Sequence, residues 1–87
     1  MTSSYRVLVT KAGARDIERL PPETRGRLKT EIEALAEAPR AAAEKLAGQD
    51  AYRVRVGDYR FVFRVDDEAR EVLVERVKHR REVYRRR

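Results

Sequence analysis

The 87-residue sequence contains no cysteine and only one histidine. Without cysteine the chain can form neither a disulfide framework nor a zinc site built from thiolates. A single histidine also supplies too few imidazole ligands for an ordinary transition-metal site. We therefore expect no metal and no other cofactor.

Long apolar runs are missing as well. No run approaches the roughly 20 residues that a helix needs to span a bilayer, and the N-terminus lacks the apolar core of a signal peptide. We see no internal repeat and no low-complexity linker. The sequence therefore predicts one small cytoplasmic domain over residues 1–87, with a modest core and no membrane span.

Negative charge is scarce in the second half of the chain. Residues 1–50 hold nine Lys/Arg and eight Asp/Glu, whereas residues 51–87 hold twelve and seven, so most of the net charge of +6 lies there. Seventeen of the 21 basic residues are arginine, which binds phosphate in a bidentate manner where lysine acts as a point charge. This pattern favours nucleic acid as a partner, before an acidic protein or a membrane surface.

The stretch that most constrains the fold is YRVRVGDYRFVF at residues 52–63. Two alternating runs flank Gly57 and Asp58, and glycine takes the positive φ that a two-residue hairpin turn requires. With this turn, Arg55 lies opposite Arg60. One face of the hairpin is then apolar, and the other carries Arg53, Arg55, Arg60 and Arg64.

Like charges that face each other across two strands destabilise a sheet. The pairing of Arg55 with Arg60 therefore indicates either that this face binds something negative or that it tolerates a solvated repulsion. Two simpler interpretations stay open at this point. Arg53 and Arg55 could form only a solvated surface, and Arg60 could form an ion pair with Asp58 or Asp66.

The remaining pattern predicts an α+β domain with the order β-α-α-β-β-β. Alternation predicts further strands at residues 5–10 and 71–77, and the helical spacing of apolar residues predicts helices at 11–20 and 22–38. An antiparallel meander plus the N-terminal strand would carry this helical hairpin on its apolar face and leave the arginine-bearing face open.

Local signals set the expected ends of these helices. Thr10 suits the N-cap of the first helix, and Pro21 and Pro22 separate the two helices because proline inside a helix loses a hydrogen bond and clashes. The connection at residues 40–49 has an alanine-rich stretch at 41–46 that could form a single helical turn.

Standard catalytic sets are not signalled: we find no Ser-His-Asp triad, no Gly-rich phosphate loop and no pair of histidines. Arginines, His79 and several tyrosines remain, and this inventory fits phosphodiester chemistry by charge stabilisation. When a 2′-hydroxyl attacks the neighbouring phosphate of RNA, negative charge builds up in the transition state, and preorganised arginines stabilise it. His79 or Tyr84 could transfer protons, whereas arginine is a poor base because its pKa stays above about 12.

Three stretches together resemble the RelE/ParE toxin superfamily. They are EKLAG at residues 44–48, the hairpin at 52–63, and VKHRREVY at 77–84. The resemblance covers nearly the whole chain and fits the predicted element order. It implies a toxin of a bacterial or archaeal type II toxin–antitoxin pair, which forms an oligomer with a cognate antitoxin. RelE-like members enter the ribosomal A site and cleave the mRNA there without a metal.

Carried over by position, the resemblance implies that Arg60 holds the scissile phosphate, that Arg80 stabilises the transition state, and that Tyr84 stacks on a base or assists proton transfer. It implies RNA contacts for Lys45, Arg53, Arg55, His79 and Arg81.

The sequence departs from the pattern at Arg53 and Arg55, where active members often have the lysine assigned as general base. His79, Tyr84 or Lys45 would have to replace that lysine, or this member cleaves weakly.

Two other functions are compatible with the sequence. ParE-like members of the superfamily poison DNA gyrase through protein contacts, although Arg60, Arg80 and Tyr84 favour the RelE branch. A nucleic-acid-binding module without catalytic activity is the third hypothesis. Beside all three, Tyr84 could only pack, and His79 could be a surface histidine or one whose hydrogen bonds are satisfied. In each toxin hypothesis we expect an antitoxin segment to place acidic residues near the arginines.

Overall fold

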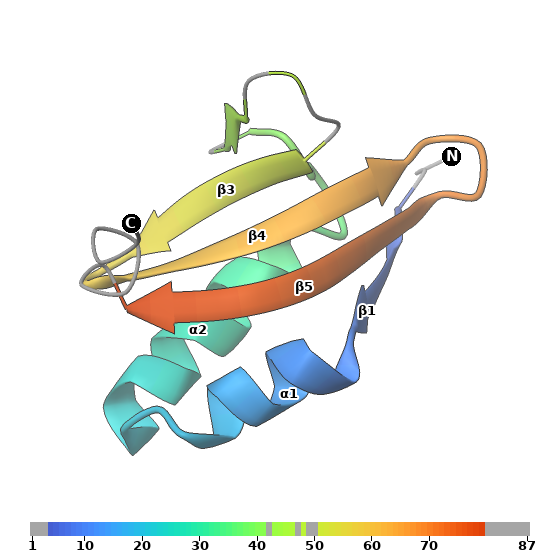
Figure 1. Cartoon of the computed structure of the whole chain (residues 1–87). Helices are drawn as coiled ribbons and strands as arrows, with labels where there is room; N and C mark the ends of the chain where they lie inside the picture. Colours follow the sequence, from blue (N-terminus) through green and yellow to red (C-terminus); the bar gives the residue numbers. More distant parts are fainter. Residues whose placement is uncertain (1–3, 42, 47, 49–50, 80–87) are drawn as a thin grey trace.

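The computed structural model describes residues 4–41, 43–46, 48 and 51–79. Seven elements follow one another along this part of the chain (Figure 1): β1 Arg6–Val9, α1 Lys11–Glu18, α2 Pro22–Ala34, β2 Glu44–Lys45, β3 Ala51–Val56, β4 Tyr59–Asp66 and β5 Glu71–His79. The strands form one mixed sheet in the order β1-β5-β4-β3-β2. β1 runs parallel to β5, and the other neighbours are antiparallel.

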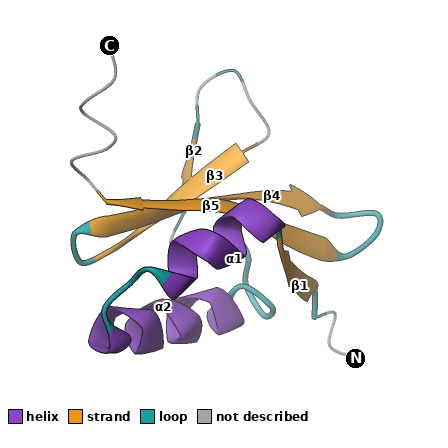
Figure 2. Cartoon of the chain, turned by 60° about the horizontal axis from the view of Figure 1, so that its bottom comes forward, coloured by secondary structure: helices purple, strands orange, loops and turns teal. Residues whose placement is uncertain are grey.

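The two helices lie on the same side of the sheet, as Figure 2 shows most clearly. The α+β class, the antiparallel meander and the helical hairpin on one sheet face are therefore confirmed. The core fills the space between these two layers. It consists of Leu20, Leu28, Ile32, Leu35, Val54, Val56, Phe61, Phe63, Val72, Val74 and Val77.

The β3–β4 hairpin has the predicted register. Arg55 is paired with Arg60 and Val56 with Tyr59, and Gly57 in the turn has a φ of 62°. The Gly57 backbone is in the left-handed region, which glycine adopts without steric cost. The register places Phe61 and Phe63, both fully buried, on the helix-covered face.

The helix α1 lies close against β5. The Thr10 side chain accepts a hydrogen bond from the Gly13 amide at 3.0 Å, which confirms Thr10 as the N-cap, and donates one to the Glu75 carbonyl at 2.8 Å. A Cβ atom at Gly13 would lie 3.1 Å from the Val74 carbonyl oxygen, so a larger residue there would push the helix and the strand apart by a few tenths of an ångström.

The structure differs from the sequence analysis in two places. A helical turn was possible at residues 41–46, but Glu44 and Lys45 form β2, which pairs with Arg53 and Tyr52. The helix α2 ends at Ala34 rather than at residue 38. Its predicted continuation is interrupted by turns at 35–37, and the Ala36 carbonyl there accepts a hydrogen bond from the Tyr5 amide at 2.8 Å.

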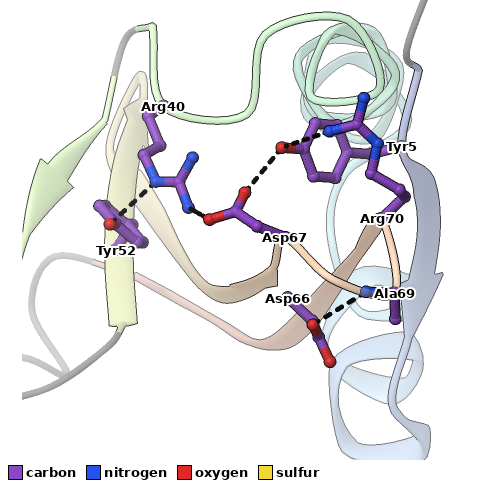
Figure 3. A network of polar contacts seen from close by, with 7 residues as sticks. All are labelled: Tyr5, Arg40, Tyr52, Asp66, Asp67, Ala69 and Arg70. Atoms are coloured by element: carbon purple, nitrogen blue, oxygen red, sulfur yellow. Dashed lines mark hydrogen bonds and ion pairs between the residues drawn. The ribbon is translucent and has the colours of Figure 1, made fainter.

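The end of the sheet near the β4–β5 turn is held by a polar network (Figure 3). Tyr5 donates to one oxygen of Asp67 at 2.7 Å, and Arg40 donates to the other oxygen at 2.8 Å and to Tyr52 at 2.9 Å. These hydrogen bonds, first from Tyr5 and then from Arg40, lower the pKa of Asp67. The network connects the N-terminal segment, the α2–β2 connection, β3 and the β4–β5 turn.

A β-bulge interrupts the pairing of β4 with β5. Val62 faces Arg76, but the next residue, Phe63, faces Val74, so that Glu75 is an extra residue in β5. Bulges re-aim side chains and increase the local twist of a strand.

Among the described residues, no helix is long and apolar enough to cross a membrane.

Asp16 fixes α1 to the part of β5 that extends beyond β1. Its carboxylate accepts hydrogen bonds from Arg76 Nε at 2.8 Å and from the Val77 amide at 2.8 Å, and its side chain is only 10% exposed. Burial by itself would raise the pKa of Asp16. The hydrogen bonds from Arg76 and Val77, with the positive charges of Arg76 and Lys78, outweigh burial and lower this pKa below 3.8.

We predict that Asp16→Asn lowers the free energy of unfolding by about 1–3 kcal/mol at neutral pH, the range for hydrogen bonds to a charged group. The native state keeps the carboxylate ionised, so the unfolded state binds more protons in acid. The stabilisation is complete above the unfolded pKa of about 3.8 and is lost as the pH falls through the lower native pKa.

Urea unfolding between pH 2.5 and 7 measures this effect. The difference between wild type and Asp16→Asn should shrink as the pH falls below about 4. Glu18→Gln is the matched control, since Glu18 is an exposed carboxylate on the same helix. A difference that stays constant across this pH range would contradict the prediction.

Candidate functional site

The sheet face opposite the helices carries a cluster of basic side chains, which we call the arginine face. Strand alternation and the observed register assign to it Arg53, Arg55, Arg60, Arg64, Arg76 and Lys78. No described helix covers this face (Figure 2). Three neighbouring strands, β3, β4 and β5, contribute these residues, so their positions are fixed by backbone pairing.

Three of the basic residues form a line across these strands. Arg55 on β3 is paired with Arg60 on β4, and Arg60 is paired with Lys78 on β5. We call Arg55, Arg60 and Lys78 the cationic row. Side chains paired in this way have Cβ atoms about 4.5–5.5 Å apart, and like charges so placed repel each other. The row therefore concentrates positive charge where a bound anion would be stabilised.

Arg60 is the buried member of the row. It is 8% exposed and is the only charged residue among the described ones that is buried. The expectation of an open surface at Arg60 is therefore wrong, although the predicted side of the sheet is right. The reason lies in its position, because β4 is the central strand and a long cationic side chain flanks Arg60 on either side in the register.

The three other arginines of this face are held by carboxylates that the sequence analysis did not identify. Arg76 forms an ion pair with Asp16 of α1 at 2.8 Å. Arg53 forms an ion pair with Glu44 of β2 at 2.9 Å, and Arg64 forms one with Glu75 at the bulge, also at 2.9 Å. Within the part of the chain that the structure describes, Arg55 and Lys78 form neither an ion pair nor a side-chain hydrogen bond. Positive charge is thus concentrated in the cationic row.

Two predicted RNA contacts lie on the other side of the sheet by register. Lys45 is paired with Tyr52, and His79 is paired with Tyr59, whose ring meets the imidazole edge-on with centroids 5.0 Å apart. Tyr52 and Tyr59 pack against the core, so Lys45 and His79 do not join the arginine face. The structure brings together Arg53, Arg55 and Arg60 from the predicted set.

The C-terminal residues Arg80, Arg81 and Tyr84 lie outside the described residues, so their roles stay predictions. Lys78 is the residue that the sequence analysis missed. The expected third strand ended at residue 77, whereas β5 continues to His79. Extending the alternation by one residue past the buried Val77 would have placed Lys78 on the arginine face.

A second surface feature lies on the helix side of the sheet. The apolar residues Val7, Val9, Ile17, Leu28 and Ile32 line a groove between β1 and the helices, and the charged residues Arg25, Lys29 and Glu33 line it too. β1 is the edge strand of the sheet on this side, and its Leu8 and Val9 are about 40% exposed.

Among the described residues, no group of three acidic or histidine side chains could hold a metal ion.

Comparisons with known proteins agree with this architecture. Residues 7–84 match the family model of the ParE toxin of the type II toxin–antitoxin system. Toxin RelG of Mycobacterium tuberculosis is 34% identical over 94% of this chain and 98% of its own.

Two solved structures extend the comparison. The toxin–antitoxin complex RelBE2 of the same organism has a TM-score of 0.81 at 29% identity and covers 87% of this chain and 98% of its own. The E. coli RelBE complex has a TM-score of 0.79 at 29% identity and covers 87% and 96%.

The fold and the basic sheet face define the toxin class of type II toxin–antitoxin systems. More particularly, the chain belongs to the RelE/ParE superfamily and is RelE-like. The resemblance noted from the sequence motifs is thereby confirmed.

The cationic row should lower stability in the absence of an anion. We predict that Arg55→Gln raises the free energy of unfolding by about 0.2–1 kcal/mol at low ionic strength, because it removes a like-charge pair. Arg64→Gln should not do so, since it removes the ion pair with Glu75. Urea titrations at low and high salt measure both effects, and the gain for Arg55→Gln should fade as salt screens the charges. A loss of stability for Arg55→Gln would contradict the interpretation.

Proposed function

We propose that this toxin is a metal-independent endoribonuclease that cleaves mRNA at the ribosomal A site and so inhibits translation. The observation that carries the proposal is the cationic row on a sheet face that neither of the described helices covers. RNA presents phosphates to such a row, and backbone pairing of β3, β4 and β5 keeps its three cations together. The resemblance to RelE-like members, stated from the motifs, points to the same reaction.

In the proposed reaction the 2′-hydroxyl attacks the adjacent phosphate, and negative charge accumulates on its oxygens. Arg60 holds the scissile phosphate from the central strand, and Arg55 stabilises the developing charge beside it. Arg53 contacts RNA only after its ion pair with Glu44 is exchanged for a phosphate contact, which tunes affinity and not the chemical step. Arg80 and Tyr84 complete the site in this proposal.

The function is tested by a cleavage assay on programmed ribosomes with purified toxin. Cut mRNA in the A site is expected for wild type, and Arg60→Ala should lower the rate by about 10²–10³-fold, the usual cost of removing one group that stabilises a transition-state charge. Arg60→Lys should recover only part of the loss, because lysine cannot bind phosphate in a bidentate manner. Arg15→Ala on α1 is the matched control and should cleave as wild type.

A second candidate function is inhibition of DNA gyrase, which the match to the ParE family model favours. Cleavage and gyrase assays on the same purified toxin distinguish the two candidate functions. Intact mRNA together with inhibited gyrase supercoiling would replace the ribonuclease proposal with the ParE-like one. Intact mRNA, active gyrase and retained RNA binding would leave a nucleic-acid-binding module.

We also propose a cognate antitoxin as partner, since the neighbouring structures RelBE2 and RelBE are toxin–antitoxin complexes. The occupant we assign to the groove beside β1 is an amphipathic antitoxin segment with acidic flanks. Its apolar side fits Val9 and Ile17, its acids face Arg25 and Lys29, and the outer edge of β1 can pair with an added strand.

We predict that Val9→Asp weakens the complex with the antitoxin at least tenfold, because it places a carboxylate in the apolar groove. Leu8→Asp is the matched control, since the neighbouring residue points to the opposite face of β1. Isothermal titration calorimetry with the small acidic protein encoded beside the toxin measures the affinity of each variant for that protein. Equal affinity of Val9→Asp and wild type would show that the groove is not the docking site.

A further inference from the structure

Lys78 is the one member of the cationic row that is not arginine. It is half-buried at its end of the row, on β5, directly opposite Arg60. A guanidinium is too weak an acid to release a proton near neutral pH, whereas an ammonium can give up a proton and regain it. The row therefore contains two fixed charges and one group able to exchange a proton.

The carboxylates on the arginine face are already engaged. Each of them has a described partner: Glu44 with Arg53, Glu75 with Arg64, Glu71 with Arg6, and Asp66 with the Ala69 amide. Among the described residues of this face, Lys78 is thus the ionisable group without a contacting partner that can also donate a proton.

We propose that Lys78 is a catalytic residue of this toxin, whose ammonium protonates the leaving 5′-oxygen when RNA is cleaved. The proposal rests on the ribonuclease function proposed above. It assigns to β5 a role that neither arginine of the row can fill.

The geometry divides the reaction between the two sides of Arg60. In an in-line displacement the attacking and leaving oxygens lie on opposite sides of phosphorus. A phosphate held by Arg60 has Arg55 on one side and Lys78 on the other, each about one strand spacing of 4.8 Å away. The flexible lysine stem lets its ammonium reach the oxygen on the β5 side.

The proposed step balances without an oxidant or a metal. The bond between the 2′-oxygen and phosphorus forms, and the bond between phosphorus and the 5′-oxygen breaks. The 2′-hydroxyl loses its proton to water, and Lys78 gives one to the 5′-oxygen and becomes a neutral amine. The amine then regains a proton from solvent. The products carry a 2′,3′-cyclic phosphate and a 5′-hydroxyl.

Three charged side chains of the described residues lie near Lys78. Arg60 faces it from β4, Arg76 lies two residues earlier on β5, and Asp16 of α1 is close enough for the lysine charge to help lower the pKa of that carboxyl. Asp16 is already held by Arg76 and the Val77 amide, so it influences Lys78 through space and forms no ion pair with it.

The test compares wild type, Lys78→Arg and Lys78→Gln on ribosome-bound mRNA. A second substrate has a bridging sulfur in place of the scissile 5′-oxygen. A thiol is a much stronger acid than an alcohol, so the sulfur leaves as a thiolate and needs no proton. Lys11→Gln, at the exposed start of α1, is the control for loss of one lysine charge.

We expect Lys78→Arg to cleave the normal mRNA about 10²-fold or more slowly, within the range for general acid catalysis, and to bind it as wild type does. On the sulfur substrate both Lys78 variants should cleave at nearly the wild-type rate. A merely structural role for Lys78 would slow both substrates alike.

Three results would overturn the proposal. Lys78→Arg at the wild-type rate on normal mRNA would leave Lys78 as a phosphate contact only. Equal losses on both substrates, with Tyr84→Phe rescued by sulfur instead, would assign the proton to Tyr84. Wild type that cuts neither substrate would overturn the ribonuclease function and this role with it, whereas the first two results leave that function intact.

Discussion

The two-residue alternation of side chains along β3, β4 and β5 is the constraint on which the rest of the structure depends. The same register that buries Phe61 and Phe63 against the helices places Arg60 on the opposite face, between Arg55 and Lys78. A slip by one residue would expose the aromatic rings and put guanidinium groups into the core. The apolar core therefore holds the three members of the cationic row in alignment.

Much of this could be predicted from the sequence, because it depends on local signals. Gly57 defines the hairpin turn, and the turn defines which residues face each other; Thr10 and the two prolines limit the first helix. The arginine-bearing side of the sheet follows from the same alternation. Three sequence motifs were sufficient to identify the superfamily, and the comparisons with known proteins support that identification.

The rest of the site depends on contacts between segments distant in sequence. Glu44 forms an ion pair with Arg53 because the short strand β2 pairs with β3 at this point. A strand of two residues shows no periodicity in the sequence, so this contact could not be predicted. Glu75 reaches Arg64 through a bulge, which breaks the alternation that sequence reasoning uses. The burial of Arg60 follows from the central place of β4, which only the strand order reveals.

The parallel pairing of β1 with β5 joins residues at opposite ends of the chain, such as Arg6 and Glu71, 65 positions apart. A sheet closed by so long a connection forms late, since the loop entropy is lost before the pairing compensates for it. During synthesis, β1 has no partner strand until β5 has left the ribosome. The cationic row needs β5 too, because Lys78 belongs to it. A chain built in this way does not have its complete basic face until β5 has been synthesised and paired.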